Sequence, residues 1–269
     1  MSSKAMISYA QNFEDVILER AFKEQTKGFY IDVGAWEPIL DSVTKHFYDK
    51  GWHGINIEPV SAYHAKLQQQ RDRDVNLNIA LLDKPGTISL YEFAGTGLST
   101  FERKHADDHK KLGLEVREQV VNVSTLAAIC VEYANDQVID FLKIDTEGTE
   151  LQVLQGGDWR HFRPRVVLLE ATIPNSQETS HAEWEPFLLQ QGYVYAYFDG
   201  LNRFYVREEE PDLLRCFGVP PNVFDSFVTY RAEEKVNQLE TRLESAMQKA
   251  DKLDKFCRSP LGRILCRMM

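Results

Sequence analysis

Acidic residues stand at the ends of several short apolar runs in this sequence. Glu58, Asp145 and Glu170 each follow or close such a run, and Asp32 lies near the end of the first one. Continuous apolar runs are typical of buried parallel strands. In an open α/β sheet, ligands bind beyond the carboxyl ends of the strands, where the strand order reverses. We therefore expect these four carboxylates at one edge of a sheet, around a ligand.

Residues 28–59 have the layout of a nucleotide-binding βαβ unit. An apolar strand at 29–33 stops at Gly34, a helical segment follows, and a second strand ends on Glu58. In such units the acid at the end of the second strand accepts hydrogen bonds from ribose hydroxyls. We assign that role to Glu58, and a cap for the next helix is the alternative.

The turn after the first strand disfavours a pyrophosphate ligand. Gly34 is followed by Ala-Trp-Glu-Pro, so the second and third glycines of G-x-G-x-x-G are missing. Those glycines let the backbone approach a pyrophosphate. Their absence therefore also disfavours a nicotinamide-dependent enzyme, whose cofactor contains a pyrophosphate. An adenosine joined to an amino acid, as in S-adenosylmethionine, suits this turn. Asp32 would then serve the amino-acid end through the turn or a bound water, and Gly34 would let the turn approach. A structural Asp32 that caps the turn is the alternative.

Several motifs occur in an order that resembles the FkbM family of S-adenosylmethionine-dependent O-methyltransferases. They cover roughly the first three quarters of the chain and lie at residues 8–15 (SYAQNFED), 32–38 (DVGAWEP), 41–59, 78–80 (NIA), 97–101 (GLSTF) and 140–148 (DFLKIDTEG).

The resemblance implies an α/β fold of the Rossmann-like class I methyltransferase type over residues 1–230. Its mostly parallel seven-stranded sheet would end in an antiparallel hairpin. The implied reaction moves a methyl group from S-adenosylmethionine to a hydroxyl. The resemblance further implies that this hydroxyl belongs to a sugar of a bacterial polysaccharide or glycoconjugate. On this fold, Asn78 and Ala80 lie where the third strand delivers residues to the adenine.

The segment 143–148 (KIDTEG) holds two carboxylates at the exit of an expected strand. A sugar hydroxyl is a poor nucleophile, so a general base within hydrogen-bond reach would assist its attack. We assign Asp145 as the base or acceptor-positioning group, with Glu147 as the second candidate. One alternative is a divalent cation held by Asp145, Glu147 and Glu170, and another is a helix-capping acid pair.

Two further segments are candidates for covering the site. We interpret residues 95–118 as a mobile polar loop with one helical turn. Residues 97–100 with the following His105 and His109 are the candidate lid over the acceptor, and either histidine is an alternative base. Gln11 and Glu14 belong to the leading motif and would close over the cofactor, although an ordinary amphipathic helix would also contain them.

The order of apolar runs predicts the elements that position these residues. We expect parallel strands at 29–33, 54–58, 76–80, 140–145 and 165–170, an added strand at 87–93, a short strand at 120–123, and a hairpin of 193–198 with 203–206 around Asp199-Gly200.

The end of the chain has a different pattern. Apolar residues recur at alternating spacings of four and three, which predicts a coiled-coil helix over 231–255 and a homo-oligomer. Residues 256–269 form a basic amphipathic tail that suits contact with an anionic membrane surface, and packing on the chain's own domain or on a dimer partner is the alternative. The seam consists of Ala232, Val236, Leu239, Leu243, Ala246, Ala250 and Leu253.

Composition limits the classes of function. The 269 residues are 43% hydrophobic and 27% charged, as in a globular protein. A net charge of -10 disfavours nucleic acid as a partner. Four scattered cysteines, with no expected secretory signal or membrane span, favour the cytoplasm.

A non-catalytic assembly protein, with a degenerate nucleotide-binding domain and a coiled-coil tail, remains the alternative to an enzyme.

Overall fold

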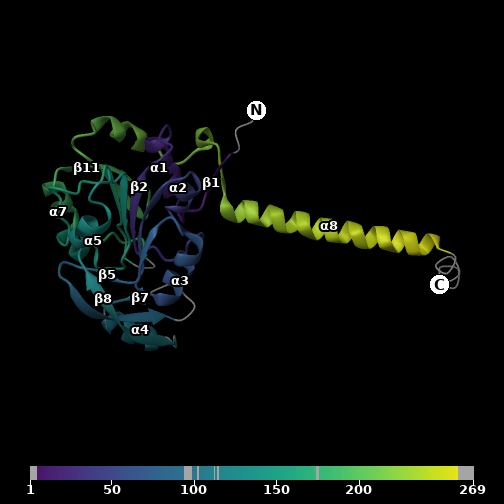
Figure 1. Cartoon of the computed structure of the whole chain (residues 1–269), viewed down its shortest axis with the longest axis horizontal. Coiled ribbons are helices and arrows are strands. Elements are labelled where there is room, and N and C mark those ends of the chain that lie inside the picture. Colours follow the sequence, from purple (N-terminus) through teal and green to yellow (C-terminus); the bar gives the residue numbers. More distant parts are fainter. Residues whose placement is uncertain are drawn as a thin grey trace. The chain divides into compact units, whose positions relative to one another are not determined.

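The computed structural model describes residues 5–93, 99–101, 103–111, 113, 115–173 and 176–259. The chain divides into two compact units (Figure 1). The larger unit is Ser8–Ser226, and the smaller unit comprises Met1–Ile7 with Phe227–Met269.

A seven-stranded mixed sheet forms the centre of the larger unit. Five neighbouring strands are parallel, and the last two form an antiparallel hairpin at one end. The predicted α/β fold, the seven strands and the terminal hairpin are therefore confirmed. The strand order is β11 (Tyr193–Phe198), β12 (Asn202–Arg207), β10 (Val166–Glu170), β9 (Phe141–Ile144), β2 (Phe29–Val33), β3 (His53–Ile57) and β4 (Val75–Leu77).

The chain order reverses between β2 and β9. From β2 the chain proceeds through β3 to β4 on one side, and it later places β9 and β10 on the other side. The two strands are in register, so that Asp32 lies opposite Lys143 and Val33 opposite Ile144. A crevice at the carboxyl end of such a reversal is where open α/β sheets bind ligands.

Helices bury both faces of this sheet. Residues of α1 (Glu14–Phe22) and α2 (Lys45–Asp49) pack on one face, and α5 (Leu126–Tyr133), α6 (Glu150–Gln155) and α7 (Glu185–Gln190) pack on the other. Every residue of β2 and β9 is buried. This two-sided burial explains why these strands read as continuous apolar runs.

A smaller four-stranded sheet replaces part of the predicted third strand. The strand expected at 76–80 is wrong in extent, because β4 ends at Leu77 and β5 (Ala80–Leu81) pairs in the other sheet. The predicted strand at 87–93 is confirmed as part of β6. The other strands of this sheet, in order after β5, are β8 (Val116–Ser124), β6 (Gly86–Phe93) and β7 (Ser99–Thr100).

The prediction of a polar loop with one helical turn over 95–118 contains too little regular structure. Residues 103–111 form α4 (Arg103–Lys111), and β8 begins at Val116. Helix α4 contains a single apolar residue, Ala106, which is fully buried, so its sequence shows no apolar periodicity. Gly97 and Leu98 of the predicted lid lie outside the described residues.

The smaller unit contains a short sheet and a long helix. Strand β1 (Met6–Ser8) pairs with β13 (Phe227–Thr229), and α8 spans Tyr230–Arg258. Residues 260–269 of the predicted basic tail lie outside the described part of the chain. Among the helices described, none combines the length and apolar character needed to cross a bilayer. The remaining elements are α3 (Ser61–Gln70) and the 3-10 helices η1 (His181–Glu183), η2 (Pro211–Phe217) and η3 (Val223–Asp225).

A buried arginine connects the two halves of the βαβ unit. The Arg71 guanidinium donates to the carbonyl of Pro38 (2.9 Å) and to Ser42 Oγ (2.9 Å), and it lies 3.8 Å from the Asp74 carboxylate. Asp74 in turn accepts hydrogen bonds from the Tyr30 hydroxyl and the Gly54 amide. Both charged side chains are fully buried. Removing either charge therefore leaves the other without its counterion in the core.

We predict that Arg71→Met lowers the free energy of unfolding by about 3–5 kcal/mol, because it strands the buried Asp74 carboxylate. Urea denaturation measures this loss. Arg160→Met is the matched control, since Arg160 is exposed and its loss should cost at most about 1 kcal/mol. Equal losses in the two variants would contradict the role of the buried pair.

Candidate functional site

A cavity of about 560 Å³ opens at the carboxyl edge of the central sheet, at the point of strand reversal. Small-molecule sites typically have volumes of this size. One wall is largely apolar, and the opposite wall is polar and acidic. The lining includes Gln11, Gly34, Trp36, Asp41, Ile57, Glu58, Val60, Tyr63, Ile79, Ala80, Leu81, Ser99, Phe101, Lys143, Asp145, Thr146, Glu147, Glu170, Thr172, Ser176, Gln177 and Leu201.

The turn at Gly34 forms the floor of the cavity. Gly34 has a φ of +77°, and its amide donates to the carbonyl of Ile57 (3.0 Å). A Cβ at this position would overlap the backbone carbonyl oxygen of Asp145. Glycine is thus needed both for the left-handed backbone and for the close approach of two loops. The turn after β2 and the exit of β9 consequently form one rigid surface.

Lys143 connects the Gly34 turn to the end of β9. Its Nζ donates to the carbonyl of Gly34 (2.7 Å) and lies 3.3 Å from Asp32 Oδ1 and 3.4 Å from Asp145 Oδ2. Burial alone would lower the pKa of Lys143, but the carboxylates of Asp32 and Asp145 outweigh it and raise that pKa. Lys143 is therefore a fixed cation. We assigned no role to Lys143 from the sequence. A lysine inside an otherwise apolar four-residue strand could have indicated a buried, paired charge.

Asp32 lies beneath the cavity and does not line it. Only 1% of its surface is exposed, and its Oδ2 accepts a hydrogen bond from Thr44 Oγ1 (3.1 Å). Its link to the cavity runs through Lys143, which contacts both Asp32 and the Gly34 carbonyl. The structure thus places Asp32 one layer behind the cavity, whereas its predicted role at the amino-acid end of the cofactor, through the turn or a bound water, stays a prediction.

Glu58 lines the cavity on the side of β3. One carboxylate oxygen accepts the Trp36 amide (2.9 Å), and the other accepts the Val60 amide (2.7 Å). Burial raises the pKa of Glu58 to about 7, outweighing the two backbone donors and Lys143, which lower it. Each oxygen retains lone-pair capacity for a further donor.

An apolar wall stands beside Glu58. Ile57, Ile79, Ala80 and Leu81 contribute to it. The rings of Trp36 and Tyr63 also line the cavity and meet edge to face, with centroids 6.0 Å apart. Neither ring was a sequence candidate. Such a wall suits a flat, weakly polar ring system.

Asn78 and Ala80, which we expected near the same ligand group, occupy different places. Ala80 lines the cavity. The Asn78 side-chain amide instead donates to the carbonyls of Glu58 and Pro59, both at 2.9 Å. Asn78 therefore holds the loop that presents Glu58.

Three carboxylates gather on the opposite wall. Asp145, Glu147 and Glu170 each place an oxygen within 4.8 Å of the others. Burial, followed by repulsion from Asp145, raises the pKa of Glu147 to about 8 and that of Glu170 to about 10. Carboxylates this close do not all ionise together near neutral pH, unless a cation joins them. The group can thus accept a proton or, in the alternative that we considered, hold a hard divalent ion.

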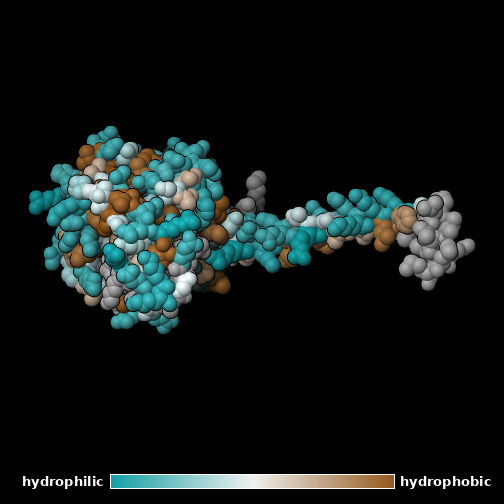
Figure 2. Space-filling model, turned by 90° about the horizontal axis from the view of Figure 1, so that it is seen from below, coloured by the Kyte–Doolittle hydropathy of each residue, from teal (hydrophilic) through white to brown (hydrophobic). Residues whose placement is uncertain are grey.

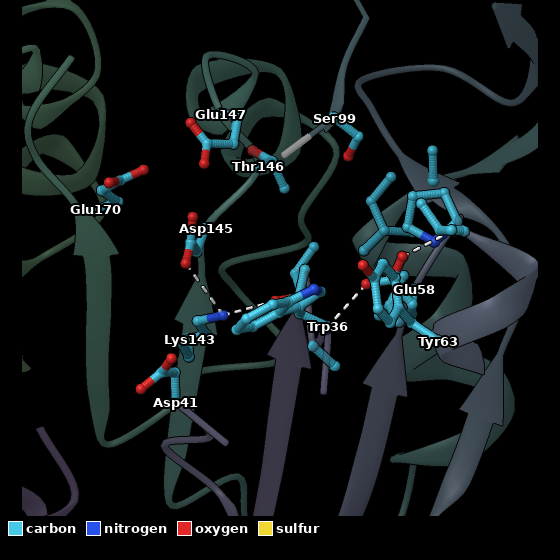
Figure 3. Close-up of a pocket in the computed structure, with 18 of the residues that line it drawn as sticks. Trp36, Asp41, Glu58, Tyr63, Ser99, Lys143, Asp145, Thr146, Glu147 and Glu170 are labelled. Atoms are coloured by element: carbon cyan, nitrogen blue, oxygen red, sulfur yellow. Dashed lines mark hydrogen bonds and ion pairs between the residues drawn. The ribbon is translucent and has the colours of Figure 1, made fainter. Parts of the chain in front are cut away.

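Glu150 fixes the loop that presents this acidic group. Its Oε1 accepts hydrogen bonds from the amides of Thr146 and Gly148 and from the Thr146 hydroxyl, all at 3.1 Å. Two backbone amides of the loop before α6 are therefore bonded to Glu150. Asp145 and Glu147 face the cavity instead (Figure 3).

The leading motif places Gln11 at the rim. Buried Glu14 accepts hydrogen bonds from the Asn12 amide (2.8 Å) and from the Asn202 side chain (2.7 Å), and burial raises its pKa to about 8. Gln11 lines the cavity while Glu14 lies behind it. His105 and His109, the alternative bases, belong to α4, and their side chains lie outside the described part.

The two walls face each other across Trp36. In Figure 3, Asp145, Glu147 and Glu170 lie on one side of the view, Glu58 and Tyr63 lie on the other, and Trp36 lies between them. A ligand that fills the cavity therefore meets an apolar slot with one carboxylate at one end and an acidic group at the other.

Comparison with solved structures gives a distant likeness. The precorrin-6y C5,15-methyltransferase of Geobacter metallireducens GS-15 is 13% identical, with a TM-score of 0.34, and the match covers 77% of this chain and 92% of that chain. A search of curated proteins finds no match.

The sequence itself matches a family model. Residues 32–195, more than half of the chain, match the methyltransferase FkbM domain. The matched range includes the Gly34 turn, Glu58, Lys143 and the three-carboxylate group. The chain therefore belongs to the methyltransferase FkbM family.

Proposed function

We propose that this protein is an S-adenosylmethionine-dependent O-methyltransferase on a Rossmann-like class I sheet. The observation that supports this proposal most is the cavity at the strand reversal, with Glu58 beside an apolar slot and a glycine-poor turn as its floor. A dinucleotide needs a glycine-rich turn around its pyrophosphate, and this chain lacks one.

The lining residues fit the parts of the cofactor. Ile57, Ile79 and Ala80 would contact the adenine, and Glu58 would accept hydrogen bonds from the ribose hydroxyls. The amino-acid end would lie on the Gly34 turn, which Lys143 holds in place. The cofactor supplies a methyl group on a positively charged sulfur. The acidic wall favours that charge.

The acidic wall would also serve the acceptor. A hydroxyl held beside Glu147 can pass its proton to that carboxylate as the oxygen forms its bond to the methyl carbon and the carbon–sulfur bond breaks. Asp145, beside Lys143, would orient the hydroxyl. A base with a pKa near the working pH is the most effective proton acceptor. Glu147, with a pKa of about 8, now becomes the first candidate.

Polar residues around the acidic wall support a sugar as the acceptor. Gln11, Thr172, Ser176 and Gln177 all line the cavity. Hydroxyl and amide side chains of this kind can bond several hydroxyls of one ligand. We therefore propose a sugar of a bacterial polysaccharide or glycoconjugate as the substrate.

We expect the affinity for S-adenosylhomocysteine to fall with decreasing pH. Glu58 must be ionised to accept two hydroxyl protons, and its pKa in the free protein is about 7. Affinity should therefore decrease by about tenfold from pH 8 to pH 6. Isothermal titration calorimetry measures this change. Glu58→Gln should abolish the pH dependence, whereas Glu147→Gln should retain it. A flat profile in the unaltered protein would count against the ribose role of Glu58.

The Gly34 turn gives a second binding test. Gly34→Ala should weaken S-adenosylhomocysteine by about tenfold or more, because the methyl group forces the floor apart at a strained backbone position. Gly51→Ala is the matched control, since Gly51 also has a positive φ but its Cβ would meet nothing closer than 4.0 Å. The same loss of affinity in both variants would mean that backbone strain alone is the cause, and it would contradict the importance of the close approach at Gly34.

Replacement of Glu147 tests the chemical step. Glu147→Gln should lower kcat by about 100-fold while cofactor affinity stays constant, since a general base contributes this much or more. In the unaltered protein kcat should rise with pH and level off above about 8, as Glu147 ionises.

Exposed Glu24→Gln is the control for this experiment. An unchanged kcat in Glu147→Gln would contradict the role of this carboxylate as base. Loss of kcat in a chelator, with recovery in Mg²⁺, would assign the acidic group to a cation instead. Cofactor binding without turnover on any glycan would favour the non-catalytic alternative.

A further inference from the structure

The long helix α8 carries an apolar stripe along one side. Figure 2 shows hydrophobic residues on one side of the helix and hydrophilic residues over the rest. Leu239, Leu243 and Leu253 are each at least half exposed, at 50%, 61% and 63%. Within the smaller unit, α8 contacts β13, the strand that directly precedes it. Isolated apolar residues on a surface are ordinary, but a contiguous stripe marks an interaction site.

The spacing of this stripe is that of a coiled coil. Apolar residues alternate at steps of four and three from Ala232 to Leu253, which places Val236, Leu243 and Ala250 at the a positions of a heptad. Ala232, Leu239, Ala246 and Leu253 then occupy the d positions. Val236 is the β-branched residue among the a positions, and Leu239 and Leu253 are the leucines at d, a combination that favours two strands.

Charged residues beside the stripe identify the partner. In this heptad register, the g positions are the basic residues Lys235, Arg242 and Lys249. The e positions are Glu233, Glu240, Met247 and Asp254. Basic g residues and acidic e residues on one helix are complementary to a parallel copy of the same helix, since g of one strand faces the following e of the other.

Two such pairs form in a parallel pairing. Lys235 of one copy faces Glu240 of the second copy, and Lys249 faces Asp254. An antiparallel pairing instead places g beside g and e beside e, which brings like charges together. Asp254 pairs with Arg258 within one helix at 2.9 Å, and both side chains are more than half exposed, so Asp254 is accessible to a second partner.

We propose that α8 forms a parallel two-stranded coiled coil with a second copy of this chain. The apolar stripe drives the association, and the g and e charges select the parallel orientation over the antiparallel one. Nothing in this inference depends on the catalytic proposal, because no residue of α8 lines the cavity.

Analytical ultracentrifugation of the full chain tests the inference. The unaltered protein should show a mass that rises with concentration toward twice that of one chain. Lys235→Glu/Lys249→Glu makes both facing g–e pairs acidic, and Glu240→Lys/Asp254→Lys makes both pairs basic, so each variant alone should remain a single chain. An equimolar mixture of the two variants should again reach twice the mass, because unlike charges then face each other.

Lys252→Glu/Lys255→Glu is the matched control, since it makes the same charge change at positions away from the stripe and should associate as the unaltered protein does. Circular dichroism checks that every variant retains its helix. A single-chain mass of the unaltered protein up to its highest soluble concentration would overturn the inference. Self-association of either charge variant, equal to that of the unaltered protein, would also overturn it.

Discussion

The cavity depends on the contacts that the ammonium group of Lys143 makes. It is buried at the strand reversal, where it contacts the Gly34 carbonyl and the carboxylates of Asp32 and Asp145. A buried charge is stable only when it is paired and hydrogen-bonded. Lys143 meets that condition by joining the end of β2 to the end of β9. The floor of the cavity thus has a fixed shape before any ligand arrives.

The carboxylates of the site differ in whether Lys143 compensates their charge. Lys143 compensates Asp32 and Asp145, whereas repulsion from the neighbouring carboxylates adds to burial in raising the pKa values of Glu147 and Glu170. Groups with strongly shifted pKa values in a cleft are typical of functional sites. The site therefore combines one rigid cation with carboxylates that bind protons near neutral pH, an arrangement suited to a positively charged donor and a proton-releasing acceptor.

Local patterns were sufficient to predict much of the fold and one side of the site. The apolar runs and the Asp199-Gly200 turn predicted the central strands and the terminal hairpin, and the βαβ pattern led to Gly34 and Glu58, both of which line the cavity. Lys143 was missed because its partner Asp32 lies more than one hundred residues away, and only the register of β2 with β9 brings them together. Helix α4 was missed because its nine residues include one apolar side chain.

We propose that an adenosyl ligand spans the cavity from Glu58 to the acidic wall. A crystal structure of the protein with S-adenosylhomocysteine measures this directly. We expect ribose hydroxyls within hydrogen-bond distance of the Glu58 carboxylate, and the sulfur directed toward Asp145 and Glu147. A ligand bound elsewhere, or a ribose turned away from Glu58 within the cavity, would contradict it.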